Sequence, residues 1–401
     1  MIQVAVLGYG TVGSGVVEVI EKNKEMVNKK ATEELNVKYI LDLREFPGDP
    51  YEDKVVHDVD IIMNDPEVKI ICETMGGLKP AYDFTKRALL AGKSVCTSNK
   101  ELVAAHGPEL IAIAKENQCN YLFEASVGGG IPIIRPLNYS LTAEKIDSVS
   151  GILNGTTNYI LTKMDKEGAA FEETLKEAQE KGYAERNPEA DIEGHDACRK
   201  IAILASLMCG KTVPYEKIYT EGISKITGED FAYAHALGMT VKLLGICKEK
   251  EGQLYAMVSP FLIGKENPLY MVNDVFNAVS VHGNMLGESM YYGKGAGKLP
   301  TASAVVSDVI DCARHLGKIV TVFWDAEEAK LTGVDEVKNK FFVRVDASKE
   351  TEAAAVFGAV TKVSCDSVKG EYAFITESMA EGEFAKKAEK LGIISRIRVE
   401  D

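Results

Sequence analysis

A polar stretch over residues 185–200 has residue types and spacing that can do chemistry. Asp196 and Lys200 stand four residues apart, so on a helix they share one face. A lysine beside a carboxylate can protonate a developing alkoxide, and the carboxylate can orient that lysine and bind a substrate ammonium group. An ion pair leading into the apolar run 201–208 can equally be structural, and the residues alone leave both interpretations open. We assign no role to the neighbouring His195.

A glycine-rich turn near the start of the chain predicts a dinucleotide site. Gly8, Gly10 and Gly13 form G-x-G-x-x-G directly after the strand-like run 4–7 and before a helical pattern. Glycines let the backbone approach a pyrophosphate, whose charge lies at the helix N-terminus. The alternative is a glycine-rich turn that holds no ligand.

Two further positions bear on the cofactor. An acidic residue after the second strand binds the ribose 2′-hydroxyl of NAD, whereas an arginine accommodates the phosphate of NADP. Asp42 and Arg44 offer both, so the sequence does not decide between the two cofactors. Lys100 follows the strand-like run 94–97 and can face a phosphate, a carbonyl or a carboxylate. It can also be a surface lysine, unfavourably placed against the dipole of the helix it begins.

A single carboxylate, Glu124, stands before the glycines at 128–130. A carboxylate with exposed backbone carbonyls suits a hard cation. A simple hinge between domains explains the same residues.

The elements that must position these residues change in character along the chain. Short apolar strands alternate with helices over residues 1–130, which predicts a parallel sheet covered on both faces. From about residue 338 the order strand, helix, strand, helix, strand, with room for one more strand near 360–363, suggests a ferredoxin-like module. For the region between, we expect strands at 148–153, 254–262 and 269–276, and helices at 171–181, 196–208, 231–244 and 300–309.

Composition narrows the function classes. The 401 residues carry a formal net charge of −14, which argues against nucleic-acid binding and a polybasic membrane anchor. No apolar run approaches 18 residues, and no basic leader precedes the first strand, so we expect a cytoplasmic protein. The eight cysteines contain no C-x-x-C pair and predict reduced thiols rather than disulfides or a zinc site.

Taken together, these segments resemble homoserine dehydrogenases over about residues 1–320. The motifs that carry the resemblance are GYGTVG at 8–13, SNKELV at 98–103, EASVGGGIP at 124–132, GILNGTTNYI at 151–160, GYAE at 182–185, DACRK at 196–200 and GKGAGKLPTA at 293–302.

The resemblance implies an α/β fold in three parts. These are a doubly wound Rossmann domain at 1–130, to which a helix near 300–320 returns, an α+β substrate and dimerisation domain at 131–299, and an ACT-like regulatory domain at 335–401. The implied reaction is the reversible NAD(P)H-dependent reduction of L-aspartate 4-semialdehyde to L-homoserine, in threonine, methionine and isoleucine biosynthesis. A homodimer or higher homo-oligomer is also implied.

Site roles come from the same resemblance. Lys200 matches the proton donor, assisted by Asp196 and by Lys100. The remaining matches are substrate-binding Glu185, Asp191, Asp196, Gly155 and Thr156; cofactor-binding Gly8, Gly10, Thr11, Val12, Gly13, Asp42, Arg44, Lys100 and Gly297; and Glu124, Val127, Gly129 and Ile131 around a sodium or potassium ion.

The sequence also allows two other functions, one enzymatic and one not. One is a dehydrogenase of the same architecture acting on another small amino-acid aldehyde. Another is a silent NAD(P)-binding sensor. The turn at 346–350 lacks the Pro-Gly common to amino-acid-binding ACT units, so the sequence names no effector.

Overall fold

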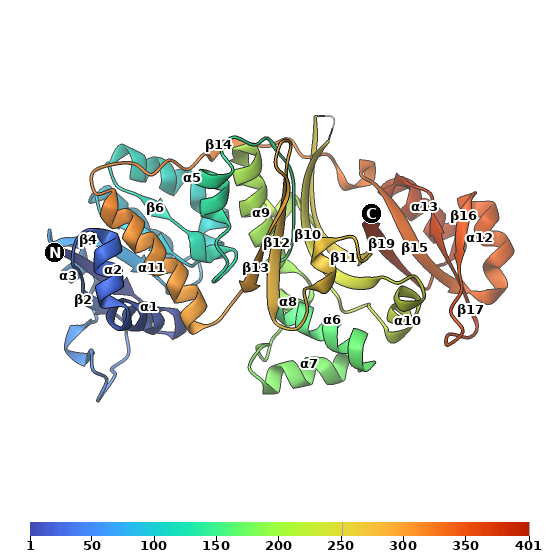
Figure 1. Ribbon diagram of the computed structural model, residues 1–401, viewed down its shortest axis with the longest axis horizontal. Helices are drawn as coiled ribbons and strands as arrows, with labels where there is room; N and C mark the ends of the chain where they lie inside the picture. Colours follow the sequence, from blue (N-terminus) through green and yellow to red (C-terminus); the bar gives the residue numbers. More distant parts are fainter. Residues whose placement is uncertain (251, 401) are drawn as a thin grey trace. The chain divides into compact units, whose positions relative to one another are not determined.

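The computed structural model describes residues 1–250 and 252–400 (Figure 1). They form two compact units. The first unit comprises Met1–Lys145, Ala202–Tyr215 and Tyr291–Ala329, and the second comprises Ile146–Ile201, Glu216–Met290 and Lys330–Asp401. Among the described helices, none has both the length and the apolar character to span a membrane.

The first unit is built on a parallel sheet. In the described residues six strands lie in the order β3 (Val55–Val56), β2 (Leu35–Leu41), β1 (Ile2–Leu7), β4 (Val68–Glu73), β5 (Ser94–Thr97), β6 (Tyr121–Leu122). The strand order reverses between β1 and β4, and open α/β sheets bind ligands beyond the carboxyl ends of strands at such a point. β1 ends at Leu7, directly before Gly8, so the glycine-rich turn lies there.

Helices cover this sheet and bring a distant segment back to it. They are α1 (Thr11–Lys22), α2 (Lys24–Ala31), α3 (Val59–Met63), α4 (Ala81–Leu90), α5 (Lys100–Glu116) and α11 (Lys298–Arg314). Figure 1 shows α11 alongside α1, and a Cβ added at Gly15 of α1 would come within 2.9 Å of the Ala302 Cβ of α11. Val305, Val309 and Cys312 of α11 join the same buried core as β1. A short parallel pair, β8 (Lys211–Thr212) and β14 (Asp325–Glu328), also belongs to this unit.

The second unit centres on a mixed sheet. Within the described residues its main path runs β13 (Gly287–Lys294), β12 (Phe276–Gly283), β7 (Ile146–Ile152), β10 (Thr240–Lys250), β11 (Gln253–Ile263), β19 (Ser395–Glu400), β15 (Lys338–Asp346), β17 (Glu371–Thr376), β16 (Val360–Val363). Two short strands join its sides, β9 (Tyr219–Thr220) on β11 and β18 (Met379–Ala380) on β15. β11 and β19 pair in parallel, so the C-terminal strand extends the sheet of the middle region.

The helices of this unit are α6 (Gly155–Glu167), α7 (Phe171–Glu180), α8 (Glu189–Ile192), the start of α9 (His195–Cys209), α10 (Gly228–Ala236), α12 (Glu350–Phe357) and α13 (Glu381–Leu391). α12 and α13 cover the strands of the C-terminal part through a core that includes Phe341, Phe374 and Phe384. The predicted α/β class and the parallel sheet predicted for the N-terminal region are confirmed, and the C-terminal strands and helices follow the ACT-like pattern.

Two predictions for the middle region are wrong. The helix expected at 231–244 stops at Ala236, because Gly238 adopts a left-handed φ of 69° and the continuously buried run from Thr240 to Cys247 forms β10 between β7 and β11. The strand expected at 269–276 is instead a 3₁₀ turn over Pro268–Met271, because Pro268 begins it and the Asn267 side chain accepts from the N–H of Leu269. Only Phe276 of that range enters a strand.

Candidate active site

The glycine-rich turn is fixed by close backbone contacts. A Cβ at Gly13 would come within 1.9 Å of the Gly8 carbonyl oxygen, so no larger residue fits while the turn keeps its shape. Gly8 itself has φ of 90°, in the region that favours glycine. The Thr74 hydroxyl donates to the Gly8 oxygen at 2.9 Å and ties the turn to the end of β4. The N-terminus of α1 is thereby held where a pyrophosphate can approach it.

Beside this turn lies a cavity of about 740 Å³, and Asp42 and Arg44 are among the polar residues that line it. The Asp42 carboxylate accepts from the backbone N–H of Tyr9 at 2.8 Å and from Nε of Arg44 at 2.9 Å. The bound Arg44 guanidinium holds the pKa of Asp42 well below its usual range. Arg44 stays 62% exposed, so its guanidinium can reach a ligand from the rim. Asp42, Arg44, Gly8 and Gly10 therefore line one cavity.

Lys100 begins α5 at the carboxyl end of β5. The neighbouring Asn99 caps that helix, because its side-chain oxygen accepts from the N–H of Leu102 at 3.1 Å. The N–H of Asn99 donates to the Thr97 hydroxyl, which donates in turn to Glu73 at 2.7 Å. Burial raises the pKa of the Glu73 carboxyl, while the hydrogen bond from Thr97 opposes that shift. This buried chain of hydrogen bonds fixes the turn from which Lys100 starts.

The carboxylate of Glu124 is engaged by the backbone. Its two oxygens accept from the N–H groups of Ile133, Ile134 and Arg135 at 2.7 to 2.9 Å. Burial raises the pKa of Glu124, and these amides oppose the shift. The N–H of Glu124 donates to Asp308 of α11 at 2.9 Å. The segment that contains the predicted cation ligands is thus fixed by hydrogen bonds at Glu124 and at residues 133–135.

Gly129 lies inside that segment with φ of 56°. A Cβ there would come within 2.2 Å of the Gly295 oxygen. In the described part of the chain, no three His, Cys, Asp or Glu side chains gather in a way that could hold a metal ion. A cation here would depend on main-chain oxygens. Gly297, with φ of 116°, precedes α11 in the same unit.

In the second unit, one amide joins the predicted substrate carboxylates. The Asn154 NH₂ donates to Asp191 at 2.8 Å and to Asp196 at 2.9 Å. Lys200, one turn along α9, donates to Asp196 at 2.7 Å and to the Leu153 carbonyl at 2.8 Å. Asp196 is buried and the Lys200 side chain is 12% exposed. The structure therefore brings Asp191, Asp196 and Lys200 together.

Other predicted substrate residues lie on neighbouring segments. Gly155 begins α6, and a Cβ there would come within 2.8 Å of the Val275 oxygen. The Thr156 hydroxyl donates to the Tyr183 carbonyl at 2.7 Å, which joins α6 to the segment that leads to Glu185. Glu185 is exposed, and its backbone oxygen accepts from Gln179. Its substrate role stays a prediction, as does the placement of Lys100 with Lys200.

Comparisons with known proteins agree along the chain. A family model described as homoserine dehydrogenase matches residues 132–310, and one described as its NAD-binding domain matches residues 8–124. A homoserine dehydrogenase of Bacillus subtilis is 43% identical over 323 residues, which cover 80% of this chain and 75% of the relative. The chain belongs to the homoserine dehydrogenase family.

Solved homoserine dehydrogenases share the fold. One from Thiobacillus denitrificans has a TM-score of 0.92 and 35% identity, covering 100% of this chain and 98% of that one. A hyperthermophilic archaeal homoserine dehydrogenase in complex with NADPH has a TM-score of 0.66 and 28% identity, covering 78% of this chain and 97% of that one. The resemblance predicted from the motifs is confirmed.

This homoserine dehydrogenase is an NAD(P)-dependent oxidoreductase of amino-acid biosynthesis. Its geometry adds one residue that sequence reasoning missed. Asn154 caps α6 through its side-chain oxygen, which accepts from the N–H of Thr157, and its NH₂ group is then directed at the two carboxylates. An asparagine directly before Gly155 and two threonines is typical of a helix N-cap, and that local signal could have singled it out.

Proposed function

We propose that Lys200 donates the proton in aldehyde reduction and that Asp191 and Asp196 bind the substrate ammonium group. The observation that carries this proposal is the Asn154 amide, which gathers both carboxylates beside the lysine. Two carboxylates held 2.8 and 2.9 Å from one NH₂ group create local negative charge that a cationic substrate group can neutralise.

The proton chemistry follows from the contacts of Lys200. When bound, the nicotinamide cofactor supplies the hydride that reduces the aldehyde carbon. Negative charge then develops on the carbonyl oxygen, and the Lys200 ammonium stabilises that charge and gives it a proton. Asp196 and the Leu153 carbonyl accept two of the ammonium N–H bonds, which leaves a third to point at the substrate oxygen. In the reverse reaction, homoserine oxidation, the neutral amine of Lys200 accepts the proton of the homoserine hydroxyl group.

The remaining predicted substrate residues complete the pocket in this proposal. Gly155 and Thr156 supply the backbone of the first turn of α6, whose N-terminus suits the substrate carboxylate. Glu185, whose side chain is exposed, is the third carboxylate that we assign to the ammonium group.

For the cofactor, we assign the pyrophosphate to the turn and helix start formed by Gly8, Gly10, Thr11, Val12 and Gly13. Asp42 and Arg44 face the ribose 2′ position, where the carboxylate suits NAD and the guanidinium suits NADP. Lys100 and Gly297 lie next to the nicotinamide half.

We also propose a monovalent cation at residues 124–131. Because three backbone N–H groups hold the Glu124 carboxylate, the ligands that fit best are the main-chain oxygens of Val127, Gly129 and Ile131 next to it. Sodium and potassium are both hard enough for such a site. Its role is to stiffen the loop rather than to take part in hydride transfer.

A homodimer is the proposed assembly. The turn and strand at Met285, Leu286 and Met290 expose apolar side chains at one end of the second unit's sheet, and an edge strand of this kind pairs readily with a second copy. The ACT-like part is proposed to stabilise the substrate-binding unit, with no effector assigned.

The test is the absorbance of reduced nicotinamide with L-homoserine and either NAD or NADP, in sodium, potassium or neither. Turnover is expected with homoserine, together with a difference between the cofactors that reports on Asp42 and Arg44. A loss of turnover in Asp191→Asn through KM, with kcat largely kept, supports the ammonium site. An unchanged homoserine KM in Asp191→Asn would refute that assignment.

A further inference from the structure

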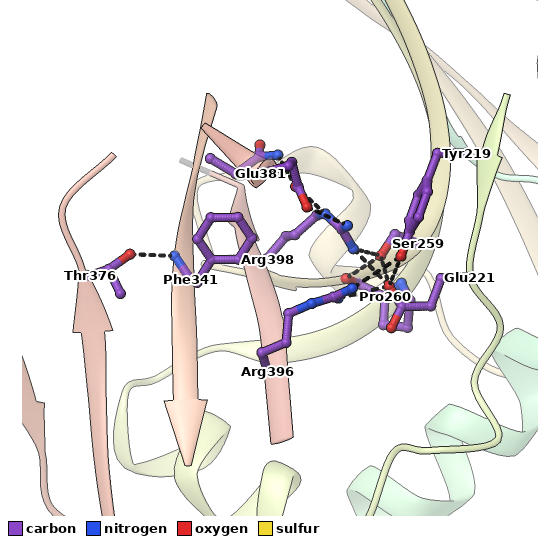
Figure 2. Close-up of polar contacts among 10 residues, drawn as sticks. Tyr219, Glu221, Ser259, Pro260, Phe341, Thr376, Glu381, Arg396 and Arg398 are labelled. Carbon is purple, nitrogen blue, oxygen red and sulfur yellow. Dashed lines mark hydrogen bonds and ion pairs between the residues drawn. The ribbon is translucent and has the colours of Figure 1, made fainter. Parts of the chain in front are cut away.

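A cluster of charged side chains in the second unit lies outside the substrate pocket. It joins the C-terminal strand β19 to the segment at 219–223 (Figure 2). Its centre is the Glu221 carboxylate, one oxygen of which accepts from Arg396 at 2.7 Å and from Arg398 at 2.8 Å. Hydroxyl groups of Tyr219 and Ser259 donate to the same oxygen at 3.1 and 3.3 Å. Burial opposes the charge on Glu221, but the two guanidinium groups outweigh burial and lower its pKa.

Arg398 makes the cluster rigid. Its side chain is fully buried, and its guanidinium also donates to both oxygens of Glu381 at 2.6 and 2.8 Å. Figure 2 shows Arg398 between Glu381 on one side and Glu221 on the other. Moving Arg398 away from either carboxylate would break charged hydrogen bonds in a buried site, so this arrangement resists displacement.

Directly after Glu221, the backbone supports the turn that joins α8 to α9. The N–H of Ile223 donates to the Ile192 carbonyl at 2.8 Å. A Cβ at Gly222 would come within 2.1 Å of that oxygen and within 2.4 Å of the Glu193 Cα. In the α8–α9 turn, a Cβ at Gly194 would lie 3.2 Å from the Cγ2 atom of Thr220, which belongs to the same segment as Glu221. The two segments are therefore packed backbone on backbone.

The supported turn separates two substrate carboxylates. Asp191 precedes Ile192, and Asp196 stands in the first turn of α9 that follows Gly194. The N–H of Gly194 donates to the Asp191 carbonyl at 3.0 Å. A movement of the backbone at 222–223 would therefore shift Asp191 against Asp196 and the Asn154 amide that bridges them.

We propose that Glu221 is a positioning residue for the substrate ammonium site. Through Arg396 and Arg398, the C-terminal strand fixes the segment at 220–223, and that segment fixes the turn at 192–194, which directly follows Asp191. The inference rests on the proposed function in one respect, the assignment of Asp191 to the substrate ammonium group. It gives the C-terminal part a role in building the substrate site that needs no bound effector.

A second ion cluster offers a matched control. Arg344 of β15 donates to both oxygens of Glu371 at 2.8 Å and to Asp230 of α10 at 2.7 Å. Glu371 is 15% exposed and Glu221 is 21% exposed, so the two carboxylates have similar surroundings. In the part of the chain that the structure describes, the hydrogen bonds of Arg344 reach α10 and its N-cap but not the turn at 192–194. Disruption of this cluster tests stability without touching the substrate carboxylates.

The experiment compares Glu221→Gln with Glu371→Gln in the full-length enzyme. For Glu221→Gln we expect the KM for L-homoserine to rise about tenfold, with kcat within threefold and the cofactor KM unchanged. Hydrogen–deuterium exchange at the amides of residues 189–194 should accelerate in this variant, because the support under the turn is loosened. Glu371→Gln should leave both the homoserine KM and that exchange at their wild-type values. Arg396→Gln keeps the Arg398–Glu381 pair. It should raise the homoserine KM and the exchange rate at 189–194 by smaller factors than Glu221→Gln does. It replaces Glu221→Gln in the test if that variant does not fold.

The outcomes separate this inference from the assignment on which it rests. Wild-type exchange at 189–194 in folded Glu221→Gln or Arg396→Gln would overturn the inference. An equal rise of the homoserine KM in Glu371→Gln would also overturn it, because the effect would then be general destabilisation. Asp191→Asn is measured in the same experiment. If its KM for homoserine equals that of the wild type, the assignment of Asp191 to the ammonium site is wrong. If its KM for homoserine rises but that of Glu221→Gln does not, only the positioning role of Glu221 is refuted.

Discussion

The two compact units hold their functional residues in different ways. In the first unit the turn at Gly8–Gly13 is shaped by backbone against backbone, with a Cβ at Gly13 excluded by the Gly8 oxygen. In the second unit the functional side chains are positioned by other side chains. Asn154 donates hydrogen bonds to Asp191 and Asp196, and Asp196 forms an ion pair with Lys200. A backbone-built site tolerates change in most side chains but not in its glycines. A site built from paired charges fails when any one partner is removed.

The largest effect that this comparison predicts is on Lys200. Lys200→Ala removes the proton donor but leaves the first unit untouched, so kcat should fall by roughly 100-fold or more while cofactor affinity stays the same. Steady-state kinetics with L-homoserine and cofactor titration by fluorescence would measure the two quantities.

Lys163→Ala is the control for that change. Lys163 forms the same kind of i, i+4 ion pair, with Glu167 on α6, and is 20% exposed. We expect its kcat to stay within about twofold of wild type, since such a pair adds only a few tenths of a kcal/mol. Near wild-type turnover in Lys200→Ala would remove the lysine from the mechanism.

A second, smaller effect is expected from the backbone-built site. Gly13→Ala forces the turn to open, and overpacking of this kind costs about 1–3 kcal/mol, so the cofactor KM should rise about tenfold or more. The KM for homoserine should change less, because the substrate carboxylates lie in the other unit.

Gly228→Ala makes the same substitution in the first turn of α10, where a Cβ meets no atom within 4 Å. It should leave both KM values unchanged. If Gly13→Ala bound cofactor as wild type does, the close contact at the turn would not matter for binding, and the contrast between the units would disappear.

The same contrast explains what the sequence could reveal. The glycine turn was predictable because its signal is local: a strand, three spaced glycines and a helix lie within 22 residues of the start of the chain. The pairing of Asp196 with Lys200 was predictable because both stand on one helix face. Asn154 was missed because its function depends on contacts with residues 37 and 42 positions further along.

Strand pairing over long separations was also beyond the sequence. The tail pattern predicted its own strands and helices correctly, but nothing in it indicated that β19 pairs with β11 or that Arg396 and Arg398 meet Glu221. The expected boundary of an ACT-like domain at residue 335 stays a prediction. The wrong helix at 231–244 has a similar cause, since the apolar residues of β10 satisfy a helical pattern until their neighbours in the sheet are known.

The smallest expected effect concerns cofactor choice at the rim of the first unit's cavity. Arg44→Ala removes an exposed guanidinium and leaves the Asp42 carboxylate bound to the N–H of Tyr9. An exposed ionic contact contributes about 1 kcal/mol at most, so the ratio of kcat/KM for NADP over NAD should fall about fivefold. The drop should shrink at high salt, because screening weakens the phosphate contact already in the wild type. Arg87→Ala, which breaks an exposed ion pair with Asp60, should leave the ratio unchanged, because neither residue lines the cavity. A ratio that stays constant in Arg44→Ala would show that the Arg44 guanidinium does not select the cofactor, which would leave that selection to the Asp42 carboxylate and the backbone beside it.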